Sequence, residues 1–255
     1  MAFRLIIGRA GSGKTHLCMQ EIREELKISP KGPSLIYITP EQATFEAEYD
    51  LLSSGIKGSI RGQVLSFRRL AFKVMQEAGG DRRIYIDDVG MAMVARKILE
   101  RCRASLKTAR ISSRQEGIVE RVVEAYNELK TSRVSLEQLQ AVAGSKILSP
   151  HLKQKIADLS LIMEQIRSEL AADYLDAEEC LDLLAAGVSR SAFLKDSRIW
   201  LDGFHSFTNQ ELAVIKELLK YTAEVTVTLC VDRDYNPDEP LNELNPFYPP
   251  ARSLI

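Results

Sequence analysis

Short apolar runs alternate with segments of helical periodicity over the first eighty residues. The runs at Leu5–Ile7, Ser34–Ile38 and Gly62–Ser66 predict three buried strands. Behind the third run, apolar residues recur at helical spacing from Phe67 to Ala78, and Gly79-Gly80 ends that helix. Three strand–loop–helix units in succession predict right-handed crossovers and therefore a parallel sheet.

The second unit contains a helix-start signal. Thr39-Pro40-Glu41-Gln42 combines a capping residue with a proline, which favours the first turn of a helix. We therefore expect a helix to begin directly after the strand at Ser34–Ile38.

From Asp87 to about Lys195 the periodicity predicts only helices, because apolar residues recur at spacings of three and four. The predicted helices are Met91–Arg103, Arg114–Lys130, Leu136–Ala143, Pro150–Ala171 and Ala177–Ala186. A stretch of this length cannot be a simple crossover, so it predicts an inserted all-helical domain.

The sheet pattern resumes with an apolar run at Arg198–Asp202, a helix at Asn209–Lys220 and a strand at Val225–Val231. The predicted fold class is therefore α/β. One discontinuous sheet domain covers residues 1–86 and 196–255, and the helical insertion covers residues 87–195.

Composition changes this picture little. The chain is 45% hydrophobic and 27% charged, which is typical of a globular protein, and no stretch approaches the ~20 apolar residues of a membrane span. Gly8 ends the N-terminal apolar run too early for a signal peptide. The four cysteines form no C-x-x-C pair, which favours reduced thiols and a cytoplasmic location.

Charge is distributed unevenly although the net charge is only −1. Seven basic residues and one acidic residue lie between Arg96 and Arg114, and seven acidic residues with Arg167 lie between Glu164 and Asp182. A basic segment can follow a phosphate backbone, but a charge run is also typical of a solvated helix face. The sequence leaves both interpretations open.

The strongest chemical motif is GRAGSGKT, which fits G-x-x-x-x-G-K-[ST] between an apolar run and a helix. Glycines allow a tight turn whose N–H groups point at phosphate oxygens, and the helix start adds positive potential. The predicted nucleotide-binding residues are Gly8, Arg9, Ala10, Gly11, Ser12, Gly13, Lys14 and Thr15. Lys14 is expected to reach the β- and γ-phosphates and Thr15 to hold Mg²⁺. The alternative is a chance glycine-rich turn.

Asp202 ends the apolar run at Arg198–Leu201, where a phosphate-loop fold places its second metal-positioning carboxylate. Asp202 is therefore predicted to hold Mg²⁺ together with Thr15, usually through water; the alternative is an ordinary aspartate at a strand end. The next residue is Gly203, which has no side chain to act as a general base. No catalytic residue is predicted, and hydrolysis is expected to be slow or absent.

Four stretches together resemble one family: GRAGSGKT, ITPEQATFEAEYDLL, QVLSFRRLAFKVMQEAGG and IWLDGFHSFTNQEL. They are similar to the B subunit of bacterial AddAB-type ATP-dependent helicase–nucleases, which process double-strand DNA ends for recombinational repair. The resemblance covers essentially the whole chain. It implies a P-loop NTPase (RecA-like) motor domain 1A with an inserted 1B-like helical domain.

The resemblance also implies functional residues and partners. Thr39, Ser66 and Phe67 match positions that contact single-stranded DNA in UvrD-like helicases, and Arg68 and Arg69 flank them. Asp202-Gly203-Phe204 stands where those helicases have Asp-Glu-Phe, which implies a degenerate motor beside an active A subunit. ATP, Mg²⁺, DNA ends, single-stranded DNA and the A subunit are the implied ligands and partners, without a membrane.

The family's second motor domain, nuclease domain and iron–sulfur cysteines are expected beyond this chain, so no nuclease chemistry is expected from these residues. Two other functions stay open. One is a stand-alone P-loop NTPase or kinase, which would need an acceptor lid and a base. The other is a non-catalytic scaffold with a relic phosphate loop.

Overall fold

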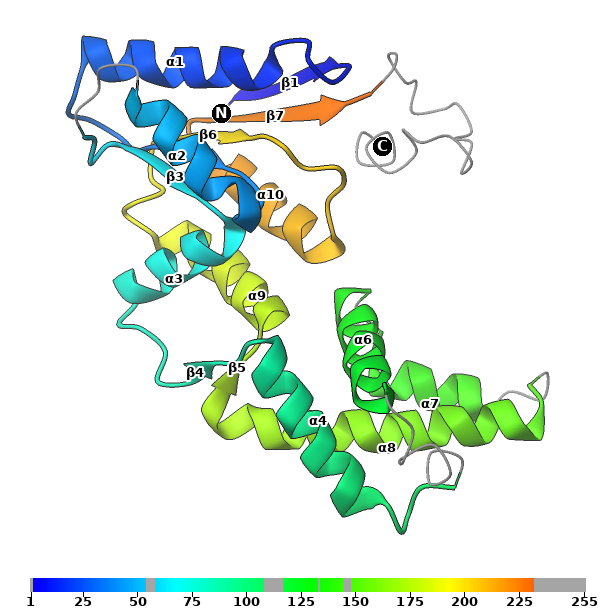
Figure 1. Cartoon of the computed structure of the whole chain (residues 1–255). Coiled ribbons are helices and arrows are strands. Elements are labelled where there is room, and N and C mark those ends of the chain that lie inside the picture. Colours follow the sequence, from blue (N-terminus) through cyan, green and yellow to red (C-terminus); the bar gives the residue numbers. More distant parts are fainter. Residues whose placement is uncertain (1, 54–57, 108–116, 133, 145–147, 232–255) are drawn as a thin grey trace. The chain divides into compact units, whose positions relative to one another are not determined.

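The computed structural model describes residues 2–53, 58–107, 117–132, 134–144 and 148–231. The chain divides into two compact units, of which one comprises residues 1–80 with 180–255 and the other residues 81–179. We call them the sheet unit and the helical unit (Figure 1).

The sheet unit is built on five strands that all run parallel, in the order β1-β7-β6-β2-β3. Their bounds are Ala2–Gly8 (β1), Leu35–Ile38 (β2), Gly62–Leu65 (β3), Arg198–Leu201 (β6) and Glu224–Cys230 (β7). The predicted parallel sheet is confirmed. Because every strand runs in the same direction, the carboxyl ends of all five strands meet at one edge.

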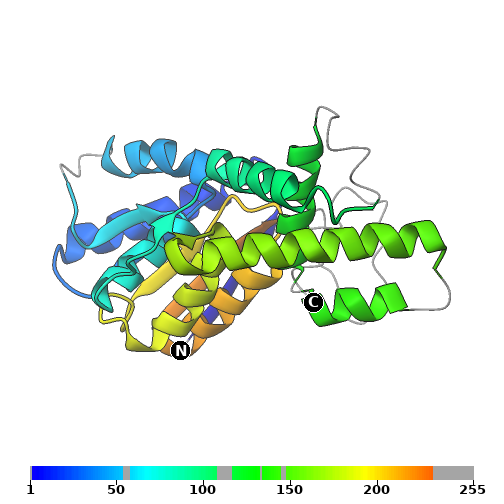
Figure 2. The same ribbon diagram turned by 90° about the horizontal axis from the view of Figure 1, so that it is seen from below.

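Helices cover both faces of this sheet (Figures 1 and 2). Their bounds are Lys14–Ile28 (α1), Thr44–Ser53 (α2), Phe67–Glu77 (α3) and Asn209–Tyr221 (α10). α1 and α2 share one buried cluster with β2, β3 and β6, in which Met19, Tyr37 and Trp200 are 1–2% exposed. α10 lies on the opposite face (Figures 1 and 2). Cover on both faces explains why the inner strands β2 and β6 are apolar runs, whereas β1 at the edge of the sheet keeps Phe3 and Leu5 exposed.

The helix expected directly after β2 begins later than predicted. A short 3-10 helix, η1, occupies Glu41–Ala43, and the α-helix starts only at Thr44. Pro40 is extended (φ −52°, ψ 146°) and precedes the 3-10 helix instead of occupying the first α-helical turn.

The helical unit contains α4 (Asp88–Cys102), α6 (Ile118–Thr131), α7 (Leu136–Gly144) and α8 (Pro150–Asp173). These helices surround one apolar core to which Ala95, Ile98 and Ile166 each contribute a side chain with no exposed surface. Another helix, α9 (Ala177–Gly187), begins in this unit and continues into the sheet unit, where the short η2 (Val188–Arg190) follows.

The expectation that residues 87–195 form only helices is wrong at one place. Tyr174–Leu175 is a two-residue strand, β5, which pairs in parallel with β4 at Ile84–Tyr85. Two residues are too few to produce a periodicity of two in the sequence, so only the pairing between distant segments reveals this strand.

Candidate functional site

The GRAGSGKT motif forms the turn between β1 and α1. Arg9–Gly13 are exposed, and Gly13 caps α1 with φ 86°, a left-handed conformation that glycine adopts without strain. The first turn of α1 has no side-chain cap and no acidic residue. Its N–H groups and its positive dipole end are therefore not satisfied by the helix's own side chains.

Lys14 is the first residue of α1, and its side chain folds back over the turn. Its Nζ donates to the carbonyl oxygen of Gly8 at 2.8 Å and to that of Arg9 at 2.9 Å. The two carbonyls hold the ammonium against the turn.

Asp202 directly follows β6 and is 3% exposed. Its Oδ2 accepts hydrogen bonds from the Thr15 hydroxyl at 2.6 Å and from the Tyr37 hydroxyl at 2.6 Å, and its Oδ1 accepts one from Thr228. β7 lies between β1 and β6, yet the turn after β1 brings Thr15 to Asp202. The structure thus brings together the two residues predicted to hold the metal.

The carboxylate changes the acidity of its neighbours. Burial, then the Asp202 charge and its hydrogen bond, raise the pKa of Tyr37. Burial and the Asp202 charge also raise the pKa of the Cys18 thiol to about 12. Among the described residues no cationic side chain forms an ion pair with Asp202, so hydroxyl donors alone surround its buried charge there.

Thr15 and Asp202 offer a hydroxyl and a carboxylate, and such oxygen donors suit Mg²⁺, which is usually held by one or two carboxylates together with water and substrate phosphates. In the described part of the chain, no group of three His, Cys, Asp or Glu residues could hold a metal by itself. A cavity of about 300 Å³ opens beside the pair and is also lined by Thr39, Glu46 and Gly203.

Gly203 follows Asp202 with φ 83°, in the left-handed region. A Cβ atom at this position would lie 3.3 Å from the Thr39 hydroxyl oxygen and 3.5 Å from Cδ of Pro40. The missing side chain therefore allows the segments after β6 and β2 to approach closely. The basic side chain nearest to Gly203 in the sequence is that of His205, which is exposed.

The residues predicted to contact DNA follow β2 and β3 at the carboxyl edge. The Thr39 N–H donates to the carbonyl of Leu65 at 3.1 Å, which joins the two strand ends. Ser66 caps α3 by accepting from the Arg69 N–H at 3.2 Å. Phe67 is 5% exposed and packs against Phe204 with ring centroids 5.4 Å apart. Its ring belongs to the core and presents no open face.

Arg68 and Arg69 are exposed, and both face Glu41. The guanidinium of Arg68 lies 2.9 Å from Oε1 of Glu41, and Nε of Arg69 lies 3.6 Å from the same oxygen. Burial alone would raise the pKa of Glu41, but the Ser66 hydroxyl and Arg68 outweigh burial, and its pKa is lowered. Glu41 therefore stays ionised and partly offsets both arginines.

The two charge runs of the sequence pair with each other in the helical unit. Lys97 forms an ion pair with Glu169, and Arg101 lies 3.1 Å from the same carboxylate. Arg96 pairs with Glu100 on the same helix. Arg110 and Arg114, which completed the predicted basic segment, lie outside the described residues. Where it is described, this segment is thus partly compensated on helix surfaces.

Sequence reasoning missed Tyr37 and Thr228 as partners of Asp202. Both lie inside strands that were correctly predicted, but an apolar run does not reveal which hydroxyl faces which neighbour. The alternation Val-Thr-Val-Thr in β7 is the one available signal, since it places Thr226 and Thr228 on the same face.

Within the described residues, no helix combines the length and the apolar character needed to cross a membrane.

Comparisons with known proteins show which family this chain resembles. The family model described as "ADDB, N-terminal" matches residues 5–254. A protein of Geobacillus kaustophilus (strain HTA426), named as the B subunit of an ATP-dependent helicase/deoxyribonuclease, is 40% identical over 260 residues. That match covers 99% of this chain and 22% of the relative.

A protein of the same name from Desulforudis audaxviator (strain MP104C) is 44% identical over 236 residues, which cover 91% of this chain and 20% of the relative. The chain therefore spans about a fifth of the length of the relatives it matches. Because the family model covers nearly every residue, the chain belongs to the ADDB N-terminal family.

Proposed function

We propose that this chain is the N-terminal, helicase-like, ATP-binding region of the B subunit of an ATP-dependent helicase–nuclease that processes double-strand DNA ends for recombinational repair. The name shared by its relatives supports this role. The observation that carries the proposal is the 2.6 Å contact between Thr15, at the end of the glycine-rich turn, and the buried Asp202.

In this proposal the sheet unit is a P-loop NTPase (RecA-like) motor domain 1A, and the helical unit is a 1B-like insertion. Residues Gly8–Thr15 bind the phosphates through backbone N–H groups and the α1 terminus. Lys14 exchanges its two carbonyl partners for the β- and γ-phosphates. Thr15 and Asp202 hold Mg²⁺, which when bound neutralises phosphate charge.

The same site is proposed to bind ATP with little or no hydrolysis. A positioned general base contributes about 10²–10⁴-fold to such reactions, and position 203 has no side chain. The left-handed backbone there means that the site lacks both the carboxylate and a backbone suited to carry one. Turnover in the complex is then assigned to the A subunit.

The DNA contact is proposed at the carboxyl edge, through the exposed Arg68 and Arg69, while Thr39, Ser66 and Phe67, which are 3–5% exposed, hold the segments that carry them. Parallel sheets bind ligands at this edge. Since Phe67 is buried, its role is to fix the start of α3, and the two arginines supply the contact with phosphates. The proposed partners are DNA ends, single-stranded DNA and the A subunit, in the cytoplasm and without a membrane.

Titration of the purified chain with Mg·ATP and with a single-stranded oligothymidine tests the proposal. We expect weak ATP binding that Lys14→Ala abolishes, while Lys216→Ala, an exposed control on α10, leaves it unchanged. Steady ATP hydrolysis that Lys14→Ala removes would contradict the proposed inactivity. Binding of nucleotide without DNA would favour a kinase, and binding of neither would favour a scaffold.

The DNA contact is tested in the full-length complex. Arg68→Ala with Arg69→Ala should weaken DNA binding and reduce its dependence on salt, since each lost phosphate contact reduces counterion release. Glu41→Gln should act in the opposite direction, because it removes the carboxylate that faces both arginines. Unchanged affinity in both variants would exclude this edge.

A further inference from the structure

A second cavity of the sheet unit lies where β2 and β3 begin, whereas the candidate site lies where they end. Its volume is about 750 Å³, and the end of α1, the loops before β2 and β3, α3 and the segment after η2 all contribute to its lining. We call it the lysine pocket. It is defined by Lys27, Lys31, Arg61 and Lys73, with Leu26, Ile60 and Phe193 as its apolar members.

No carboxylate is among the described residues that line this pocket. Arg61 is already neutralised, because its guanidinium donates to the carbonyls of Pro33 and Ser29 and lies 3.2 Å from the Glu25 carboxylate. Lys73 donates to the Gln63 amide oxygen at 2.8 Å, which leaves its charge uncompensated.

Lys27 and Lys31 are exposed and form no ion pair within the described part of the chain. Nearby carboxylates are engaged elsewhere: Glu25 pairs with Arg61 and Arg198, and Glu77 accepts from Ser191 and from the N–H of Phe193. The pocket therefore presents three lysine charges that the surrounding described residues do not balance.

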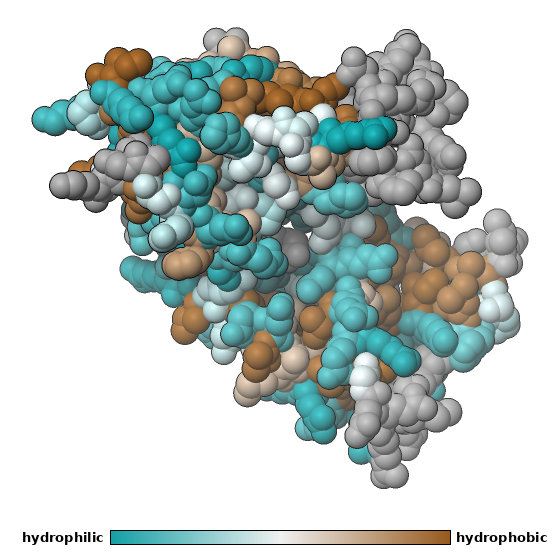
Figure 3. All heavy atoms as spheres, turned by 45° about the horizontal axis from the view of Figure 1, so that its top comes forward, coloured by the Kyte–Doolittle hydropathy of each residue, from teal (hydrophilic) through white to brown (hydrophobic). Residues whose placement is uncertain are grey.

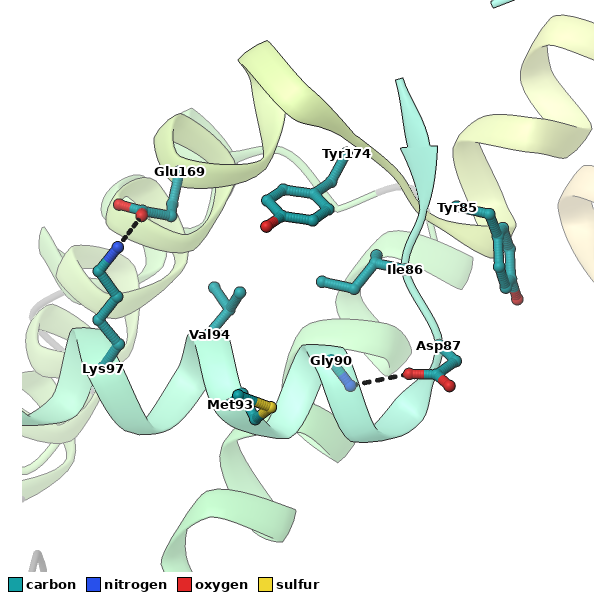
Figure 4. Close-up of a pocket in the computed structure, with 9 residues that line it drawn as sticks. All are labelled: Tyr85, Ile86, Asp87, Gly90, Met93, Val94, Lys97, Glu169 and Tyr174. Carbon is teal, nitrogen blue, oxygen red and sulfur yellow. Dashed lines mark hydrogen bonds and ion pairs between the residues drawn. The ribbon is translucent and has the colours of Figure 1, made fainter. Parts of the chain in front are cut away.

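The large cavity of the helical unit provides the contrast. It measures about 490 Å³ and also contains a lysine, Lys97, but Figure 4 shows that residue paired with Glu169 across the pocket. An unbalanced cationic lining thus distinguishes the lysine pocket from a basic surface that the chain itself compensates.

The apolar members indicate which kind of anion fits. Single-stranded nucleic acid is usually bound by aromatic faces on which bases stack. Here the Lys73 ammonium lies 4.3 Å from the Phe193 ring centroid and already occupies a face of it. Ile60 is 92% exposed, and Ile28, next to Lys27, is 85% exposed. On the face drawn in Figure 3, brown hydrophobic residues reach the surface among teal hydrophilic ones. Aliphatic side chains beside lysines suit a polypeptide with acidic and apolar side chains.

We propose that the lysine pocket is a docking surface for an acidic segment of a partner polypeptide. This inference rests on the proposed function, under which that partner is the A subunit. β2 and β3 begin at the pocket and end just before Thr39 and Ser66. At about 3.3 Å per residue, a four-residue strand separates the two ends by about 13 Å, so the pocket and the candidate site lie at opposite edges of the sheet.

The test uses the full-length protein and the purified A subunit. Lys27→Glu with Lys31→Glu should lower the association rate constant at least tenfold at low salt, and the difference from the wild type should shrink at high salt. Lys27→Gln with Lys31→Gln should give a smaller loss. The matched control is Lys153→Glu with Lys155→Glu, which reverses two charges on α8 in the helical unit.

Equal association rates for all variants would overturn the docking surface while leaving the proposed function intact. Weaker oligothymidine binding with unchanged A-subunit association would also overturn it, in favour of nucleic acid. Failure of the wild-type protein to bind the A subunit would instead overturn the partner in the proposed function, and with it the occupant named here. Retained ATP binding and an unchanged melting temperature establish that each variant folds.

Discussion

Asp202 in the sheet unit and Asp176 in the helical unit are both buried carboxylates, with 3% and 6% of their surface exposed, but their partners differ. Asp176 forms an ion pair with Lys130, lies 3.4 Å from the Tyr126 hydroxyl and caps α9 by accepting from the Glu179 N–H. Within the described part of the chain, the side chain of Asp202 accepts only from hydroxyl groups.

A buried charge is costly unless it is paired, and a buried ion pair is destabilised strongly when one partner is removed. Asp176 has the Lys130 ammonium as its partner, so its charge is balanced within the fold. The charge of Asp202 is solvated by Thr15, Tyr37 and Thr228 but not neutralised by them. Under the proposed function, Asp176 serves the fold and the charge of Asp202 is available to Mg²⁺.

The largest effects are expected from two separate substitutions, each of which removes the charge of one of these buried carboxylates. Asp202→Asn should weaken Mg²⁺-dependent ATP binding by about 100-fold, the upper range for groups that act on a metal through its outer shell. Asp176→Asn should leave ATP binding unchanged but lower the free energy of unfolding by about 3 kcal/mol, because Lys130 loses its counter-ion. Nucleotide titration and urea unfolding measure the two quantities.

Trp200 is the only tryptophan, so its fluorescence follows the sheet unit while far-ultraviolet circular dichroism follows all helices. If Asp202→Asn lost more stability than Asp176→Asn, with ATP binding intact, the two carboxylates would have been assigned the wrong roles.

A smaller effect is expected from substitutions of Gly203, the residue after Asp202. Gly203→Ala should lower the free energy of unfolding by about 1–2 kcal/mol, because a Cβ atom disfavours the left-handed backbone. Gly203→Asn should cost less, since asparagine tolerates this region. Gly203→Glu should not create ATP hydrolysis, as measured by phosphate release. Hydrolysis gained by that one substitution would show that the site lacks only a carboxylate.

The smallest effect is expected at Thr228 in β7, compared with Thr226 on the same strand. Thr228→Val removes a hydroxyl that donates to Asp202, and we expect about a tenfold loss of Mg²⁺-dependent ATP affinity. Thr226→Val is the matched control, because Thr226 is equally buried and its hydroxyl has no hydrogen-bond partner among the described residues. Similar losses in both variants would mean that packing in β7, not the hydrogen bond, sets the affinity.

Several features of this molecule were readable from short stretches of sequence. The turn at Gly8–Thr15 is local, so its glycines, its lysine and the helix behind it lie within one continuous segment. The five strands were marked by apolar runs, most clearly β2 and β6, whose residues are almost all buried because both faces of the sheet are covered there. The parallel direction followed from the intervening helices.

Other features needed the folded chain. The hydroxyls of Tyr37 and Thr228 reach Asp202 from other strands, and Glu41 meets two arginines that follow a different strand. The basic run at Arg96–Arg101 is compensated in part by Glu169, far away in the sequence.

The sequence by itself determined the glycine-rich turn between β1 and α1 and the carboxylate directly after β6. Only the tertiary structure decided that Thr15 and Asp202 touch, that Phe67 is buried against Phe204 and that Gly203 lies against Thr39. Periodicity records how each segment meets the core, while these contacts depend on strand order and on the side chains that neighbouring strands direct toward each other.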